Sequence, residues 1–164
     1  MLEVAIDADE EWDSSRSWDE LVRRAAEAAI AESAFPQLAT SDRSVELSVR
    51  LTDDEEVRGL NAEWRGKDKP TNVLSFPSDA PKIAGAPALL GDIAIAYETL
   101  AREAAAEKKP FLHHLAHLAV HGYLHLVGYD HQTDSEAEAM EALERETLAA
   151  MRIPDPYADA ADIV

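Results

Sequence analysis

Residues 121–131 read His-Gly-Tyr-Leu-His-Leu-Val-Gly-Tyr-Asp-His, and this stretch organises the rest of the chain. In a helix, His121 and His125 lie on one face, about 6 Å apart along the axis, close enough to share a metal ion. Gly128 follows as a residue that tolerates positive φ and can end the helix, so His131 can return to the same ion. Three neutral imidazoles suit Zn²⁺ and leave one tetrahedral position open for water, as in catalytic zinc sites. The stretch therefore predicts a buried helix and a turn, with one zinc ion on the three histidines.

The histidine row continues upstream, because His113 and His117 precede His121 at the same four-residue spacing. His117, His121 and His125 on one straight helix would span about 12 Å, which is too long to converge on one ion. We therefore predict His131 as the third ligand, and we place His117 beside the ligands or in the core.

The residue after the first ligand separates this pattern from that of the zinc proteases. Those enzymes carry a glutamate directly after the first histidine as the general base. The chain has Gly122 at this position, so the usual route of peptide hydrolysis lacks its base. A peptidase-like zinc hydrolase is therefore the weaker alternative.

The composition predicts a single domain over residues 1–164, with residues 154–164 as a mobile acidic tail. The chain has no cysteine, which excludes disulfides and leaves histidine and carboxylate as zinc ligands. No apolar run approaches the ~20 residues of a membrane span, and the first residues do not resemble a secretory signal. We therefore expect a cytoplasmic protein without membrane contact.

The net charge of −18 argues against non-specific binding of nucleic acid, because phosphates would be repelled. Between residues 65 and 82 the balance reverses, and four basic side chains outnumber two acidic ones: Arg65, Lys67, Lys69 and Lys82 against Asp68 and Asp79. Such a basic island on an acidic body is either a local anion site or an ordinary solvated loop.

Hydrophobic periodicity predicts an α+β fold with a small four-stranded mixed sheet packed against about five to six helices, the histidine-bearing helix being central. Alternating apolar residues indicate strands near 2–6, 45–51, 72–77 and 91–96. Helical spacing and capping sequences indicate helices near 17–33, 53–64, 98–108, 110–127 and 133–151. The helix after the second strand should turn Val57, Leu60 and Trp64 inward. A helix joins the first two strands, which predicts a parallel pair, and a loop joins the last two, which predicts an antiparallel pair.

Three blocks of sequence together resemble the YbeY family, bacterial endoribonucleases of ribosomal RNA maturation. The blocks are residues 121–131, the run from Arg65 to Pro77 with Asn61 before it, and the run from Leu90 to Ile93. The resemblance implies a zinc ion on three histidines and cleavage of single-stranded RNA. It also implies processing of small-subunit rRNA, especially its 3′ end, a part in ribosome quality control, and an arginine at position 65 that matters for activity.

Four side chains near the basic island are candidates to contact RNA. Arg65 is the predicted catalytic residue, because its planar guanidinium suits the charge that develops on a phosphate in the transition state. Lys67 and Lys69 are predicted to hold flanking phosphates. Ser75 is a candidate to hydrogen-bond substrate, although a serine in a strand is more often structural.

Two aspartates, Asp92 and Asp130, are candidates to orient a ligand histidine through its free ring N–H, as carboxylates often do beside metal sites. Equally, Asp92 could cap a strand end and Asp130 could be a turn residue. A non-catalytic ribosome assembly factor is the remaining alternative function. In that case zinc would fix the turn after the central helix, and the chain would bind small-subunit ribosomal proteins or an assembly GTPase.

Overall fold

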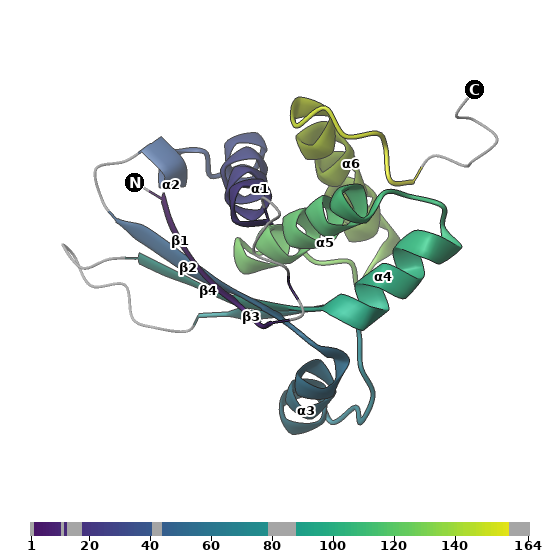
Figure 1. Cartoon of the computed structure of the whole chain (residues 1–164). Coiled ribbons are helices and arrows are strands. Elements are labelled where there is room, and N and C mark those ends of the chain that lie inside the picture. Colours follow the sequence, from purple (N-terminus) through teal and green to yellow (C-terminus); the bar gives the residue numbers. More distant parts are fainter. Residues whose placement is uncertain (1, 11, 13–17, 41–43, 79–87, 158–164) are drawn as a thin grey trace.

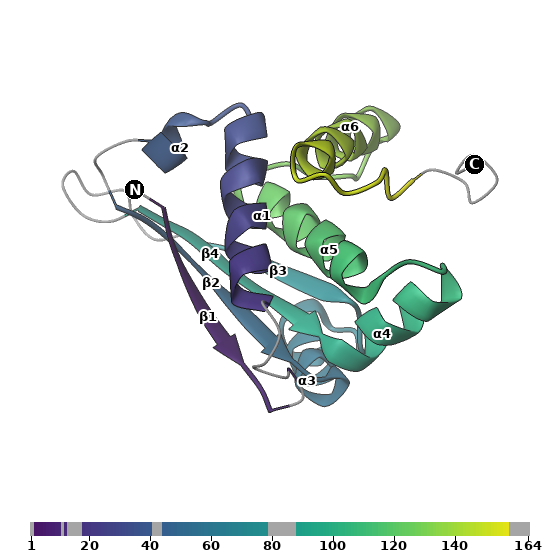
Figure 2. The same cartoon turned by 45° about the horizontal axis from the view of Figure 1, so that its top comes forward.

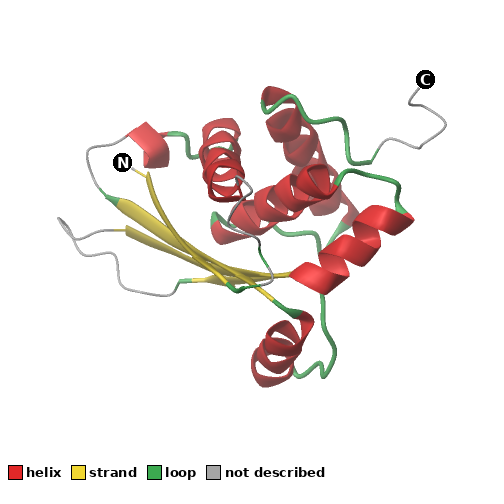
Figure 3. Cartoon of the chain, viewed as in Figure 1, coloured by secondary structure: helices red, strands yellow, loops and turns green. Residues whose placement is uncertain are grey.

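A computed structural model of the chain describes residues 2–10, 12, 18–40, 44–78 and 88–157. The strands are β1 (Leu2–Ala8), β2 (Val45–Thr52), β3 (Val73–Pro77) and β4 (Ala88–Ala96). The helices are α1 (Trp18–Glu32), α2 (Gln37–Thr40), α3 (Asp54–Arg65), α4 (Tyr97–Ala106), α5 (Phe111–Leu126) and α6 (Asp134–Ala150). The predicted α+β fold, with one four-stranded sheet and five to six helices, is confirmed (Figure 3).

The sheet is mixed, with the strand order β1-β2-β4-β3. β1 pairs with β2 and β2 pairs with β4 in parallel, whereas β3 pairs with β4 antiparallel. Both predicted pairings are therefore present. Alternate residues of β2 are buried, namely Val45, Leu47, Val49 and Leu51, so one face of this strand supplies the main core.

Helices cover the two faces of the sheet unequally (Figures 1 and 2). α1, α5 and α6 lie over one face, and α3 lies on the other. α5 is the central helix that the sequence predicts, since it contacts α1, α4, α6 and the strands β3 and β4. Its approach to the sheet is close because Gly122 carries no side chain: a Cβ there would lie 3.0 Å from Ile93 Cγ2.

Side-chain caps and glycines set the ends of several helices. Asp53 caps α3 by accepting a hydrogen bond from the Glu56 amide at 2.8 Å. Thr133 caps α6 in the same way through the Glu136 amide at 3.2 Å. α5 ends at Leu126, and Gly128 has a φ of 108°. Glycine tolerates this conformation best, so the predicted stop and turn before the last histidine are confirmed.

One side chain differs from the expectations. Trp64 was expected to point inward, but it is 66% exposed. The reason is that α3 covers only part of its face of the sheet, and Trp64 borders the remaining open groove of about 900 Å³. The described part of the predicted tail, residues 154–157, contacts the loop between α4 and α5, where Lys109 Nζ donates to the Pro156 carbonyl at 2.7 Å. Residues 158–164 lie outside the described part of the chain.

None of the helices in the described part of the chain combines the length and apolar character needed to cross a membrane.

Candidate metal centre

Three imidazoles converge at the C-terminal end of α5. His121 and His125 come from the helix, and their Nε2 atoms lie 3.1 Å apart. His131 comes from the turn after the helix, and its ring centroid lies 5.5 Å from that of His121 and 5.0 Å from that of His125. One ring nitrogen from each residue lies within 4.8 Å of the others. The structure thus brings together the three predicted ligands in an arrangement that could hold a metal ion.

The turn that carries the third histidine is held by main-chain contacts. The Tyr129 amide donates to the Leu124 carbonyl at 3.0 Å, which closes the last turn of α5. The Tyr129 hydroxyl accepts a hydrogen bond from the Ala34 amide at 3.0 Å, which ties the turn to the segment after α1. Asp130 accepts from the His131 amide at 2.8 Å. The position of His131 therefore depends on packing between segments far apart in the sequence.

The hydrogen bonds around the rings fit a metal ion. His121 Nδ1 lies 2.5 Å from Glu144 Oε1, so Nδ1 carries the proton and Nε2 keeps its lone pair. The His125 ring also hydrogen-bonds a backbone group, that of Tyr129, and its Nε2 faces His121. The two Nε2 atoms lie 3.1 Å apart, and ligand nitrogens on a tetrahedral zinc are about 3.3 Å apart. The helical pair is therefore already at the ligand spacing of zinc.

Two ionisable groups at the centre have shifted pKa values. Burial lowers the pKa of His125, and the neighbouring His121 and His131 rings lower it further, which keeps the imidazole neutral. Burial alone would raise the pKa of the Glu144 carboxyl, but hydrogen bonds from His117, His121 and Tyr157 outweigh burial and lower its pKa to about 2. Neutral imidazole and ionised carboxylate are the forms that a metal centre needs.

The sequence motifs do not predict Glu144 as part of this centre. It lies on α6 with no exposed surface, and its Oε2 lies 3.1 Å from His117 Nε2. A signal was present in the sequence: Glu144 sits at helical spacing between Met140 and Leu148, two fully buried apolar residues. A carboxylate on the apolar side of an amphipathic helix needs a buried partner. His117 shares this carboxylate with His121, which places it next to the three convergent imidazoles.

The two aspartates proposed to orient a histidine occupy other places. Asp92 accepts a hydrogen bond from the Ser48 hydroxyl. Successive residues of a strand point to opposite faces, so Asp92 lies on the face opposite Ile93, which packs against α5. Its predicted role is therefore wrong. Asp130 lines the cleft but binds the His131 amide, so it supports the turn rather than a ring.

A cleft of about 670 Å³ opens in front of the histidines. Arg65 lines the cleft together with the outer strand β3. Its Nη2 donates to the Ser75 carbonyl at 2.6 Å, and its guanidinium lies 5.8 Å from the centre of the Phe76 ring. The exposed guanidinium thus shares one cleft with the three histidines, as the sequence predicts.

The other predicted substrate contacts are Ser75, Lys67 and Lys69. The Ser75 side chain is buried, and its hydroxyl donates to the Gly122 carbonyl at 3.3 Å. Ser75 therefore joins β3 to α5, and because it also lines the cleft, its contact with substrate stays a prediction. Lys67 and Lys69 are exposed on the loop after α3 but do not line the cleft. Their contact with flanking phosphates stays a prediction.

Comparison with known proteins identifies the family. The family model described as endoribonuclease YbeY matches residues 5–152. An endoribonuclease YbeY of Rhodopseudomonas palustris strain BisA53 is 59% identical over 160 residues, covering 96% of this chain and 90% of the relative. That of Bradyrhizobium diazoefficiens is 56% identical over 163 residues, covering 97% and 86%. The solution structure of TM1509 from Thermotoga maritima matches with a TM-score of 0.56 at 24% identity over 96% of this chain and 98% of that one, which supports the fold. The chain therefore belongs to the endoribonuclease YbeY family.

Proposed function

We propose that the protein is a zinc-dependent endoribonuclease that cuts single-stranded RNA and matures small-subunit rRNA, especially at its 3′ end. A part in ribosome quality control and a cytoplasmic location complete the proposal. One observation carries it: in a chain of this family, three convergent imidazoles and the exposed Arg65 share a single cleft. The cleft volume of about 670 Å³ gives room for one or two nucleotides of an unpaired strand.

The residues of the cleft have different roles in the proposed reaction. His121, His125 and His131 would hold the zinc ion, which when bound lowers the pKa of a coordinated water towards ~7 and polarises a phosphoryl oxygen. Arg65 would bind the scissile phosphate and stabilise the extra negative charge of the transition state. Asp130 is the only carboxylate among the described residues that line the cleft, so it is the side chain available to hold a proton there.

The charge of the protein bears on its partners. A chain with a net charge of −18 repels RNA at long range. We therefore propose that a protein partner, either small-subunit ribosomal proteins or an assembly GTPase, delivers the enzyme to its RNA. This partner role stands beside the catalytic one, because a purely structural zinc site does not require an open cleft lined by an exposed arginine.

The test pairs metal analysis with RNA cleavage. Purified protein should contain one zinc ion per chain, cut a labelled single-stranded RNA, spare the same sequence in a duplex, and lose activity on chelation until zinc is returned. His121→Ala, His125→Ala and His131→Ala should each lose most of the metal and the activity. His113→Ala is the matched control, because His113 lies two turns before the ligands on the same helix and does not line the cleft. Zinc-loaded protein that leaves every single-stranded RNA intact would contradict the proposal.

A further inference from the structure

Glu144 is the only acidic residue that is fully buried in the described part of the chain. It extends from α6 towards the three histidines, and its two carboxylate oxygens contact different neighbours. Oε1 lies 2.5 Å from His121 Nδ1, and Oε2 lies 3.1 Å from His117 Nε2 and accepts a hydrogen bond from the Tyr157 hydroxyl. Both ends of the carboxylate are therefore occupied, which stops the side chain from rotating away from His121.

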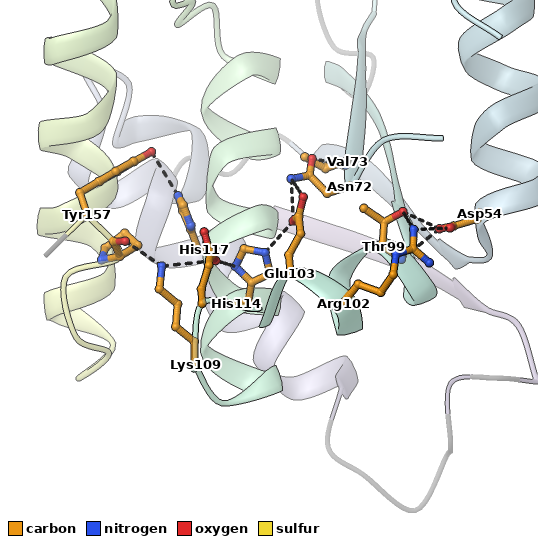
Figure 4. Close-up of polar contacts among 12 residues, drawn as sticks. Asp54, Asn72, Val73, Thr99, Arg102, Glu103, Lys109, His114, His117 and Tyr157 are labelled. Carbon is orange, nitrogen blue, oxygen red and sulfur yellow. Dashed lines mark hydrogen bonds and ion pairs between the residues drawn. The ribbon is translucent and has the colours of Figure 1, made fainter. Parts of the chain in front are cut away.

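Tyr157 lies in the segment after α6, and several contacts hold its side chain against His117. Its ring meets the His117 ring edge to face at 5.3 Å between centroids, and its hydroxyl lies 3.3 Å from His117 Nε2 (Figure 4). The Arg145 guanidinium lies 5.2 Å from the centre of the tyrosine ring. Lys109, on the loop before α5, anchors the segment by donating to the Pro156 carbonyl.

We propose that Glu144 and Tyr157 act as a positioning pair for the metal centre: Glu144 fixes the ring and the tautomer of His121, and Tyr157 fixes Glu144. The C-terminal segment thereby becomes part of the metal centre although it supplies no ligand. The inference rests on the proposed function only in requiring that a metal ion binds the three histidines.

The physical basis is preorganisation. A carboxylate that binds one ring nitrogen of a ligand histidine fixes the direction in which the other ring nitrogen presents its lone pair. The ring is then ordered before the metal binds, so metal binding costs less conformational entropy. The carboxylate also makes the imidazole a stronger donor to the metal. Tyr157 contributes indirectly, because without its hydroxyl Glu144 Oε2 keeps His117 as its one partner among the described side chains.

The test measures metal affinity, with no RNA present. Glu144→Gln keeps the shape of the side chain but places an amide N–H₂ opposite either the His121 donor or the two donors at Oε2, so one or two of the three hydrogen bonds are lost. We expect zinc affinity, measured by competition with a chromophoric chelator, to fall by about 10- to 100-fold. Tyr157→Phe should lower the affinity in the same direction but by less. The visible absorption spectrum of the Co²⁺-loaded protein should change in both variants, because the ring of His121 is no longer held at one angle.

Two matched controls separate positioning from simple loss of stability. Glu103→Gln removes a similar pair, in which Glu103 Oε1 lies 2.8 Å from His114 Nε2, but this pair touches no ligand (Figure 4). Tyr123→Phe removes a buried hydroxyl that donates to the Val22 carbonyl at 3.0 Å. Both controls should lower the melting temperature while zinc affinity and the Co²⁺ spectrum stay those of the parent protein.

Several outcomes would overturn the inference. Zinc affinity and Co²⁺ spectra like those of the parent in both Glu144→Gln and Tyr157→Phe would do so, and so would an equal loss of affinity in the two controls. If Glu144→Gln does not fold, Tyr157→Phe decides, since it removes only one hydroxyl. A parent protein that binds zinc but cuts no RNA would contradict the proposed function alone and leave this inference in place.

Discussion

At the scale of single residues, Gly122 explains why this chain cannot use the mechanism of the zinc proteases. It follows His121, the first of the three convergent histidines, but it faces the sheet: an added Cβ would lie 3.0 Å from Ile93 Cγ2 and 3.3 Å from Ser75 Oγ. A glutamate at this position would have no room between α5 and the sheet. The general base of the zinc proteases is therefore not only missing here but sterically excluded.

The same contact predicts the effect of the smallest substitution. Gly122→Ala should destabilise the protein by about 1–3 kcal/mol, because overpacking forces α5 away from the sheet. Gly59→Ala is the matched control, since Gly59 lies inside the exposed helix α3 with nothing within 4 Å of an added Cβ. That change should stabilise the protein by about 0.5–1 kcal/mol. Urea unfolding of both variants checks the prediction, and equal shifts of the same sign would refute it.

Arg65 allows catalysis to be separated from folding. Its side chain is exposed, and within the described part of the chain it donates one hydrogen bond, to the Ser75 carbonyl. Arg65→Ala should therefore lose at most about 1 kcal/mol of stability and keep its zinc, while RNA cleavage slows by about 10²–10⁵-fold. Arg65→Lys should recover little, because an ammonium cannot reproduce the two-pronged guanidinium.

A second arginine on the same helix serves as the control for that measurement. Arg58 is exposed and bound to Asp68 at 2.8 Å. Arg58→Ala should cleave RNA at the parent rate, because Arg58 does not line the cleft. Near-parent cleavage by metal-loaded Arg65→Ala would show that Arg65 is structural.

At the scale of elements, α3 and α4 cap each other at their N-termini. The Thr99 amide of α4 donates to Asp54 Oδ1 at 3.0 Å, and the Asp54 amide of α3 donates to Glu98 Oε1 at 3.2 Å. The Thr99 hydroxyl and Arg102 also bind the Asp54 carboxylate (Figure 4). Each helix thus supplies the acceptor that the first turn of the other lacks, which joins the ends of β2 and β4.

Asp54 makes this contact dependent on pH. Burial would raise the pKa of Asp54, but hydrogen bonds from Thr99 and Arg102 outweigh it and lower the pKa below its usual value. A lowered pKa in the folded state means that the stabilisation is present above the unfolded-state pKa, about 3.9, and is lost as the pH falls through the folded-state pKa. Asp54→Asn should therefore be less stable than the parent by about 1 kcal/mol at neutral pH, and the difference should vanish in acid.

Urea unfolding of the two proteins at several pH values measures that difference. Asp68→Asn is the control, since the Asp68 carboxylate makes its ion pair with Arg58 at the surface, where such pairs contribute little. A stability difference for Asp54→Asn that does not depend on pH would contradict the assignment of the lost energy to the charge of Asp54.

At the scale of the whole molecule, an acidic body carries a small basic surface. Arg65, Lys67 and Lys69 are exposed close together at the end of α3 and in the loop that follows it. Lys82, the fourth basic residue of the predicted island, lies outside the described residues. The RNA contact must therefore be local, and the rest of the surface opposes it through the net charge of −18.

This distribution predicts a weak dependence of RNA binding on salt. Four contacts at about −0.7 per neutralised phosphate give a slope of about −3 in a plot of log affinity against log salt concentration. Fluorescence anisotropy of a labelled single-stranded RNA, with the protein kept metal-free to prevent cleavage, measures the slope. The double variant Lys67→Ala with Lys69→Ala should make the slope shallower by about 1.4. Arg24→Ala on α1 should leave it unchanged, and a parent slope steeper than about −4 would reveal a larger basic surface.

Much of the fold and the convergence of the three histidines could be predicted because they depend on local repeats. The helical repeat aligns His121 with His125, and Gly128 allows the turn that returns His131. Alternation and the lengths of the connections likewise predict which strands pair in parallel and which antiparallel. Residues within one helix and its turn have few alternative arrangements, so their spacing alone decides which side chains meet.

Only the tertiary structure decides what surrounds those histidines. Glu144 lies 23 residues from His121 and meets it because α6 packs on α5, and Tyr157 reaches the same carboxylate from beyond the end of α6. Asp92 stands on the other face of the sheet, and Trp64 stays exposed because α3 covers only part of that face. These positions depend on how separate elements pack together, and packing is set by the summed shape of many buried side chains, which no single spacing in the sequence encodes.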